Sequence, residues 1–98
     1  MLEDTGPLRE EYRELTERRL PAAADDDWPV TEDHCFQRIV LDTLFEDAWY
    51  DHVDGRPAVR SLTADQLREA IRIAESLLED PERVAVLNRR SLRYRGEH

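Results

Sequence analysis

The stretch LTADQLREAIRIAESLLED, residues 62–80, carries the strongest structural signal in the chain. Thr63 and Gln66 have the spacing of a capping box, in which each side chain bonds the backbone amide of the other residue. From Leu67 onward, apolar residues recur every three or four positions, which is the period of one helix face. The stretch therefore predicts an amphipathic helix over residues 64–79 that buries one face in a core.

Three further helices are predicted on either side of this one, by periodicity and by capping residues. Pro21 and Pro29 are expected to break helices because proline lacks the amide that a helix interior needs, whereas Pro81 suits a first turn. Thr31 is the expected N-cap of the second helix, and DGRP, residues 54–57, predicts a turn after it. The expected elements are a helix at 7–19, a linker at 20–30, a helix at 32–50, a helix at 64–79, a helix at 81–92 and a frayed tail at 93–98.

These elements predict an all-α fold, because no segment alternates apolar and polar residues as a half-buried strand does. Residues 1–98 are enough for a single domain with one modest core. The apolar faces of the helices must cover one another, which favours a compact single-domain bundle of about four helices.

The composition is acidic, and every basic residue is an arginine. The chain carries 14 Lys and Arg against 23 Asp and Glu, for a net charge of −9, and it contains no lysine. The acidic excess lies in residues 1–55, whereas residues 83–95 hold five arginines and no acid. Such a molecule disfavours nonspecific binding to nucleic acid, although a local basic end can still contact an anion or an acidic surface.

Cysteine usage and hydropathy predict a cytoplasmic location. Cys35 is the only cysteine, which excludes an internal disulfide and fits a reducing compartment. No apolar run approaches the roughly 18 residues of a membrane-spanning helix. The N-terminal sequence MLEDTGPLREE is acidic where a signal peptide is basic and apolar. We therefore expect no membrane partner.

The segment DHCFQRIVLD, residues 33–42, gathers the densest set of reactive side chains. His34, Arg38 and Asp42 are spaced by four and share one row on a helix, while Cys35 falls in the first turn, where backbone amides lower a thiol pKa. One interpretation is a catalytic or ligand-contacting site at these four residues. The alternative is structural: Cys35 packs as a small apolar residue, and Arg38 pairs with Asp42. We expect Cys35 to be buried, because a small bundle can spare few apolar positions.

Two aromatic residues, Trp49 and Tyr50, are predicted to close one end of the core or to line a binding site beside that segment. Asp51 and His52 follow them and, with His34 and Cys35, offer the ligand types that zinc uses, but their spacing matches no compact zinc signature. The sequence therefore predicts no metal site, and it contains no cofactor motif.

The segment NRRSLRYRG, residues 88–96, forms the basic end of the chain. Its arginines, Arg89, Arg90, Arg93 and Arg95, are of the type found in phosphate-contacting tails. They also lie at a helix C-terminus, where positive charge is favoured and where an acidic partner could dock. We treat all four as candidate binding residues, for a protein partner first and for nucleic acid second.

Several of these segments together resemble a group of known proteins. The chain resembles small bacterial and archaeal proteins sometimes labelled Gcn5-related acetyltransferases, through W-P-V at 28–30, D-H-C-F-x-R-I-x-L-D at 33–42, W-Y at 49–50 and R-P-A at 56–58. An acetyltransferase of that type would bind acetyl-CoA through a glycine-rich pyrophosphate loop. This chain has three glycines, no such loop and no predicted sheet, so no catalytic residue is carried over.

The sequence as a whole predicts a protein that binds another macromolecule, as an adaptor, regulator or accessory subunit, rather than an enzyme. The first alternative is a small enzyme or ligand-binding protein with its site at His34, Cys35, Arg38 and Asp42. The second is a nucleic-acid-associated protein that uses the arginine-rich C-terminal end. A homo-oligomer is compatible with each. A pocket with convergent polar groups near Cys35 would favour the ligand site over the adaptor.

Overall fold

The capping box at Thr63 is formed, and it starts the helix around which the bundle packs. The computed structural model describes residues 4–53 and 58–96; in it, the Thr63 hydroxyl accepts from Gln66 N at 3.1 Å and Gln66 Oε1 accepts from Thr63 N at 2.9 Å. The helical elements of the described residues are α1 (Gly6–Arg13), η1 (Glu14–Arg19), α2 (Leu20–Ala23), α3 (Asp33–Phe45), η2 (Trp49–Asp51), η3 (Ala58–Ser61), α4 (Ala64–Glu79) and α5 (Glu82–Tyr94). The bounds of α4 coincide with the range that its capping box and apolar stripe predict.

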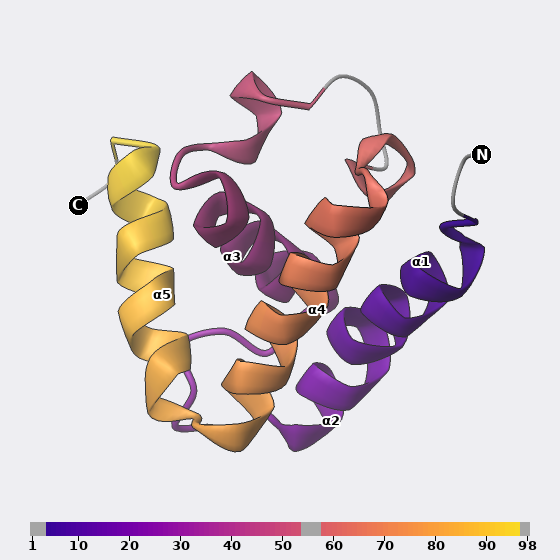
Figure 1. Cartoon of the computed structure of the whole chain (residues 1–98). Coiled ribbons are helices and arrows are strands. Elements are labelled where there is room, and N and C mark those ends of the chain that lie inside the picture. The colour runs from indigo at the N-terminus through magenta and orange to yellow at the C-terminus, as the bar shows by residue number, and fades with distance from the viewer. Residues whose placement is uncertain (1–3, 54–57, 97–98) are drawn as a thin grey trace.

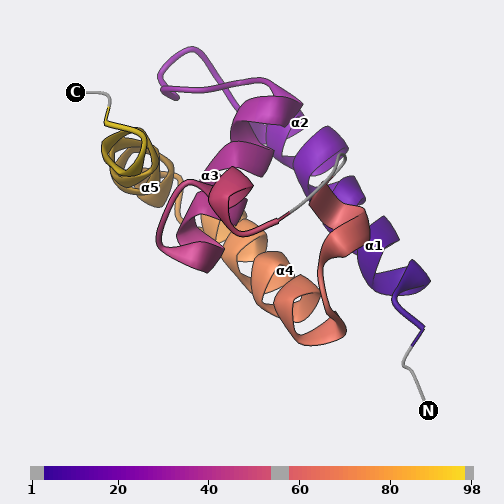
Figure 2. The same cartoon turned by 90° about the horizontal axis from the view of Figure 1, so that it is seen from above.

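The helix α4 lies at the centre of the bundle. Figure 1 shows α1 on one side of it, α5 on the other and α3 behind, and Figure 2 shows the same order from above. The apolar stripe of α4 packs against α1 and α3, and α3 in turn packs against α5. No strand occurs in the described part of the chain. The structure therefore confirms an all-α, single-domain bundle, with four long helices when the run from α1 to α2 is taken as one.

The N-terminal helix runs further than predicted, from α1 through η1 to α2 without a break. The sequence predicted an end at Arg19 and a breaker at Pro21, but Pro21 lies within α2. The turn before it, η1, is π-helical. Proline lacks an amide and its ring clashes with the carbonyl of the preceding turn, and a wider turn accommodates both effects. The linker is therefore confined to residues 24–32 rather than 20–30.

The second predicted helix is shorter than the expected range 32–50. The helix α3 ends at Phe45, because Glu46 adopts a left-handed conformation with φ of 53° and turns the chain towards η2. At the other end, Glu32 rather than Thr31 occupies the N-cap position. Left-handed caps are usually glycine, so a glutamate in that conformation left no mark in the sequence pattern.

The C-terminal helix is slightly longer than predicted. Arg93 and Tyr94 belong to α5 rather than to the tail that was expected to fray from residue 93. Residues 97–98 of that predicted tail, and the turn predicted at residues 54–57, lie outside the described residues.

A single apolar core joins the helices. Its fully buried side chains include Tyr12, Phe36 and Leu67, from three different helices. Trp28 holds the linker against this core, with its ring edge-on to Phe36 at 6.0 Å between centroids. None of the described helices combines the length and apolarity that a membrane-spanning segment needs.

Candidate functional site

A cavity of about 890 Å³ lies between the N-terminal helix and α3, and the turns η2 and η3 complete its wall. Small-molecule sites commonly have volumes of about 300–1,000 Å³. We name this feature the α1–α3 cavity. Its wall consists of Gly6, Arg9, Glu10, Tyr12, Arg13, Glu17, His34, Cys35, Gln37, Arg38, Leu41, Trp49, Tyr50, Ala58, Val59, Arg60 and Arg95.

The cavity wall contains buried polar atoms that no protein group satisfies. Among the described residues, four buried side-chain nitrogen or oxygen atoms have no hydrogen-bond partner: Arg9 Nε, Tyr12 Oη, Arg38 Nε and Thr43 Oγ1. The first three belong to residues of the cavity wall. Leaving a buried polar group unsatisfied costs about 1–3 kcal/mol. The residues that carry these three atoms line the cavity, although the atoms themselves are enclosed by the protein.

Tyr12 offers a neutral hydroxyl in a fixed position. Its side chain is 2% exposed, and this burial, followed by the negative charge of Glu17, raises the pKa of the phenol above its usual value. Thr16 Oγ1 donates to Tyr12 O at 3.0 Å and accepts from Gln37 Nε2 at 3.3 Å, which joins η1 to α3. The π-helical turn that carries Thr16 is of a type found frequently at functional sites.

Arg38 is oriented by a contact with α5. Its Nη2 donates to Asn88 Oδ1, a neutral acceptor that leaves the positive charge uncompensated, and its Nε is buried without a partner. Arginine carries donors and no acceptor. Any group that satisfies Arg38 Nε and Arg9 Nε must therefore be a hydrogen-bond acceptor.

The wall is more positive than the molecule to which it belongs. Five arginines line it, against two glutamates. Arg13 Nε lies 3.5 Å from Glu17 Oε1, and Arg95 Nε lies 2.8 Å from Asp42 Oδ2. No carboxylate of the described residues lies within 4.0 Å of the other three guanidiniums, those of Arg9, Arg38 and Arg60. The cavity is thus a local positive site in a chain of net charge −9.

Asp42, one of the candidate residues, lies in the interior and outside the cavity wall. Its carboxylate accepts from Ser91 Oγ at 2.6 Å, from Arg95 Nε at 2.8 Å and Nη2 at 3.2 Å, and from Trp49 N at 2.9 Å. These bonds join α3 to α5 and to η2. The pairing of Arg38 with Asp42 that their spacing suggested is not formed, because both side chains find partners on α5 instead.

His34 and Cys35 lie in the first turn of α3 and belong to the cavity wall. The His34 ring is exposed, with Nδ1 3.4 Å from Glu32 Oε2 and 3.6 Å from Asp33 Oδ1. We expected Cys35 to be fully buried, but it is half-buried, because it lines the cavity. The partners of His34 are therefore carboxylates, and Cys35 is a thiol that lines the cavity.

The remaining sequence candidates separate into two groups. Trp49 and Tyr50 line the cavity from η2, and Arg95 lies over the Tyr50 ring, with its guanidinium carbon 5.1 Å from the ring centroid. By contrast, Arg89, Arg90 and Arg93 are exposed on α5 and do not line the cavity. The structure thus brings Cys35, Arg38, Trp49, Tyr50, Arg95 and His34 together and places Asp42, Arg89, Arg90 and Arg93 elsewhere.

Sequence reasoning missed Arg9, Tyr12 and Arg60 as site residues. Tyr12 has the spacing of a core residue, and its ring is indeed buried in the core. Arg9 and Arg60 have no feature that distinguishes them from other surface arginines in the sequence. These residues lie in α1 and η3, which no spacing rule connects to α3.

Comparison with known proteins assigns no function to this cavity. Among residues 4–53 and 58–96, no three His, Cys, Asp or Glu side chains gather as metal ligands do. No protein-family model, no curated protein and no solved structure matches the chain. Its function is therefore argued from the residues of the cavity.

Proposed function

We propose that this protein binds a small organic anion in the α1–α3 cavity. The observation that carries the proposal is that Arg9, Arg38 and Arg60 line one cavity, with no carboxylate of the described residues within ion-pair distance. The oxygens of a carboxylate or phosphate group accept hydrogen bonds from guanidiniums, and such bonds are charge-assisted and short. A neutral ligand would leave the buried part of that positive charge uncompensated, which is unfavourable in a low-dielectric wall.

The apolar part of the wall supports an organic ligand rather than a bare inorganic ion. Leu41, Trp49, Ala58 and Val59 line the same cavity as the arginines. Ligand sites of this kind are mostly apolar, with a few polar groups that fix orientation. The anionic group would bond the arginines, and the body of the ligand would cover the apolar side chains.

Binding rather than catalysis is the proposed role, in the cytoplasm. Catalysis by a cysteine requires a base within hydrogen-bond reach of the thiol. The described residues place no such base on Cys35, and His34 is directed towards Glu32 and Asp33. A single unpaired thiol suits a reducing compartment.

Isothermal titration with citrate, benzoate and pyrophosphate tests the proposal. At least one of these anions is expected to bind, and Arg9→Gln is expected to weaken it by about tenfold, the effect of losing one charged hydrogen bond. Arg90→Gln is the matched control, because it makes the same change on an exposed residue outside the cavity. The proposal fails if none of the three anions binds, or if both variants weaken binding equally.

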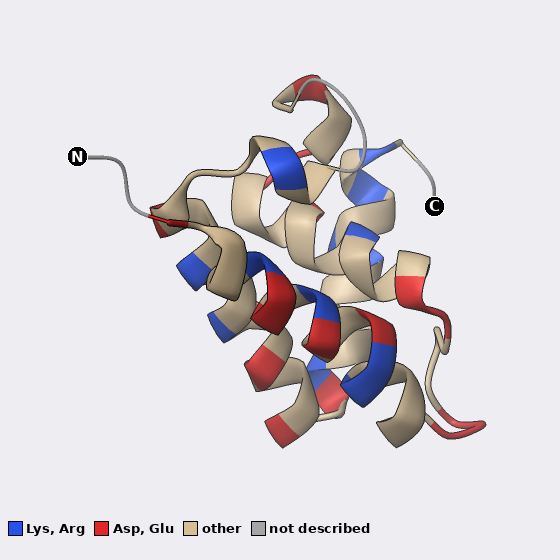
Figure 3. Cartoon of the chain, turned by 90° about the vertical axis from the view of Figure 1, so that its right-hand side faces the viewer, with Lys and Arg blue, Asp and Glu red and all other residues tan. Residues whose placement is uncertain are grey.

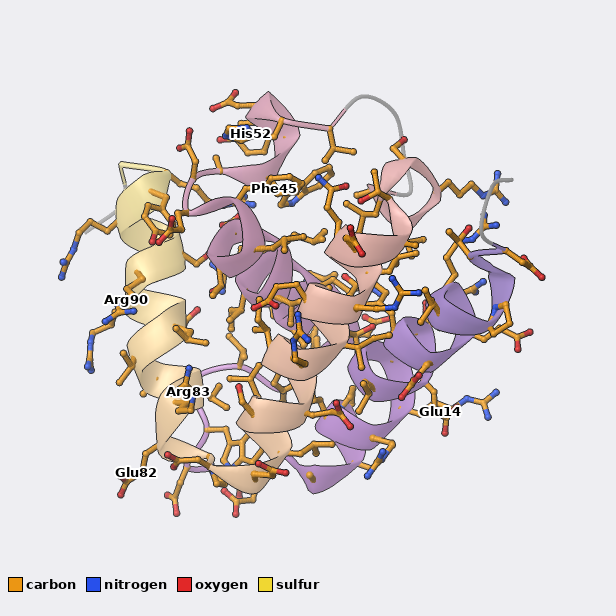
Figure 4. All side chains as sticks on the ribbon, viewed as in Figure 1. Glu14, Phe45, His52, Glu82, Arg83 and Arg90 are labelled. Carbon is orange, nitrogen blue, oxygen red and sulfur yellow. The ribbon has the colours of Figure 1, made fainter. Side chains whose placement is uncertain are left out.

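A second candidate function, docking of an acidic protein partner, is favoured by the outer face of α5. We define the α5 basic face as Arg83, Val86, Arg89, Arg90 and Arg93, all exposed. None of its arginines has a carboxylate of the described residues within ion-pair distance. Figure 4 shows Arg90 projecting away from the bundle on the α5 side, whereas Figure 3 shows acidic and basic segments interleaved on the opposite, α1 side.

An acidic protein segment complements this face better than nucleic acid does. Val86 is 37% exposed between the arginines and offers an apolar contact. A protein segment can place an apolar side chain on Val86 between its carboxylates, whereas the phosphate backbone of a nucleic acid is uniformly charged. This candidate therefore retains the adaptor function expected from the sequence, and it is independent of the cavity.

Fluorescence anisotropy with a labelled glutamate-rich peptide and a labelled mixed-sequence oligonucleotide tests the second candidate. The peptide is expected to bind at low salt, and the double variant Arg89→Glu, Arg93→Glu is expected to abolish binding. Arg18→Glu reverses one exposed charge on η1 and serves as the control. If the oligonucleotide binds more tightly than the peptide, the partner of this face is a nucleic acid rather than a protein. If neither probe binds, the second candidate function is wrong.

A further inference from the structure

We infer that the anion bound in the α1–α3 cavity is a nucleoside diphosphate, with its phosphates at Arg9, Arg38 and Arg60 and its planar ring beside Trp49. The inference rests on the proposed function and adds the chemical class of the ligand. It combines three properties of one wall: the number of uncompensated charges, the space available and the aromatic surface of η2.

The charge of the wall fits a ligand with more than one negative charge. Arg9, Arg38 and Arg60 come from α1, α3 and η3, three elements that each contribute to the wall of this cavity. None of the three has a carboxylate of the described residues within ion-pair distance. Planar guanidinium forks match the geometry of phosphate oxygens and bind them with two parallel bonds. A diphosphate supplies charge for all three, whereas a monocarboxylate compensates one.

The space exceeds what a phosphate group alone needs. A cavity of about 890 Å³ lies in the upper part of the range for small-molecule sites, about 300–1,000 Å³. Glu10 also lines the wall, where its carboxylate can accept a hydrogen bond from a sugar hydroxyl. The dimensions and this acceptor therefore fit a ligand that carries a sugar next to its phosphates.

The turn η2 supplies an aromatic surface on the same wall. Trp49 and Tyr50 meet edge to face, with their ring centroids 6.1 Å apart, and both line the cavity. Stacking on aromatic side chains tolerates any nucleobase, because every base has a π face. This arrangement recognises a planar ring without selecting one base.

Calorimetric titration with ADP, UDP, pyrophosphate and citrate separates the ligand class from the proposed function. ADP and UDP are both expected to bind at least about tenfold more tightly than pyrophosphate, the increment that one stacked base contributes. Protection of Cys35 from a neutral thiol reagent provides a second readout, since Cys35 lines the cavity. Arg60→Gln should weaken both nucleotides and pyrophosphate, and Arg90→Gln should weaken none.

Two tryptophan variants test the position of the ring. Trp49→Leu should reduce the affinity for ADP towards that for pyrophosphate. In case that variant fails to fold, Trp28→Phe leaves Trp49 as the only tryptophan, and its fluorescence should be quenched by ADP and not by pyrophosphate. Trp28 itself packs on Phe36 and does not line the cavity.

The outcomes distinguish the two proposals. Citrate binding as tightly as ADP, with sensitivity to Arg9→Gln, would overturn the nucleotide and leave the anion site standing. An unchanged preference for ADP over pyrophosphate in Trp49→Leu, or an unquenched Trp49, would overturn the placement of the ring. Binding of no anion, with no protection of Cys35, would overturn both proposals.

Discussion

Arg38 and Asp42 lie one turn apart on α3, but only Asp42 has its hydrogen-bonding groups satisfied by the rest of the chain. Asp42 is fully buried and accepts bonds from Ser91, from Arg95 and from the Trp49 amide. Arg38 donates to one neutral amide and keeps a buried nitrogen without a partner. We refer to these two regions as the Asp42 cluster and the α1–α3 cavity.

The difference teaches how buried polar residues divide between stability and binding. A buried charge that the chain itself pairs and hydrogen-bonds fixes the positions of the elements that supply the partners. A buried donor that the chain leaves unsatisfied lowers stability until another molecule satisfies it. The two regions share α3, so the Asp42 cluster also holds one wall of the cavity in place.

The largest expected effect is on the Asp42 cluster. Asp42→Ala should lower the free energy of unfolding by about 3 kcal/mol, because it removes one partner of a buried ion pair. The Arg95 side chain is 20% exposed and can reach water in part, which limits the loss. Urea denaturation measures it, with Asp51→Asn on the exposed η2 turn as control. A loss no greater than that of the control would mean that the cluster does not stabilise the fold.

A smaller effect is expected from the hydroxyl of the same cluster. Ser91→Ala removes one hydrogen bond of 2.6 Å to a charged acceptor, and should lower the free energy of unfolding by about 1.5 kcal/mol. The same denaturant experiment applies. In the double variant with Asp42→Ala, the two losses should not add, because the bond is already absent. Full additivity would contradict the coupling of these residues.

In the cavity wall, unlike in the Asp42 cluster, loss of a hydroxyl should not lower the free energy of unfolding. Tyr12→Phe removes a buried oxygen that has no partner, so the free energy of unfolding should change by less than about 0.5 kcal/mol, or rise. A clear loss of stability, comparable with that of Ser91→Ala, would show that the Tyr12 hydroxyl is satisfied within the protein and would remove the contrast between the regions.

The smallest expected effect concerns an exposed carboxylate next to the cluster. The Ala48 amide donates to Asp47 at 2.8 Å and His52 lies 3.2 Å away, and both lower the pKa of Asp47 below its ordinary value of 3.8. His52 also stacks on Phe45 (Figure 4), with centroids 5.2 Å apart. A lowered folded pKa stabilises above the unfolded pKa, and this contribution is lost as the pH falls through the folded value.

Comparison of wild type with Asp47→Asn measures that contribution. The stability difference between the two should shrink as the pH falls from about 5 to below the lowered pKa of Asp47. Chemical denaturation at a series of pH values follows it. A difference independent of pH would mean that the carboxylate gains nothing from its two partners.

The sequence identified part of the candidate site but not the residues of α1 and η3 that complete its wall. His34, Cys35 and Arg38 were singled out because they cluster in one segment. The structure places them on the cavity wall with three other candidates, Trp49, Tyr50 and Arg95. Arg9 and Arg60 escaped notice, because an arginine that lines a cavity has the same sequence surroundings as one that faces solvent.

The sequence by itself determined what depends on neighbouring residues. The bounds of α4, the all-α fold and the burial of one face of each helix follow from capping bonds and periodicities that span a few positions. Helix ends were less certain where the cause was nonlocal or lacked a characteristic residue. The passage of the first helix through Pro21 and the left-handed Glu46 are the two examples.

Only the tertiary structure decided which buried polar side chains find hydrogen-bond partners within the protein and which do not. The bond between Asp42 and Arg95 joins residues 53 positions apart, and the one between Arg38 and Asn88 joins residues 50 positions apart. Neither follows from spacing, since helical neighbours three or four residues apart were available to both side chains. The packing of α5 on α3 brings Ser91 and Arg95 to Asp42 and brings Asn88 to Arg38. A buried carboxylate that accepts several hydrogen bonds is better satisfied than one with a single partner. The cavity arises in the same way, from helices whose separation is set by the whole core rather than by any one segment.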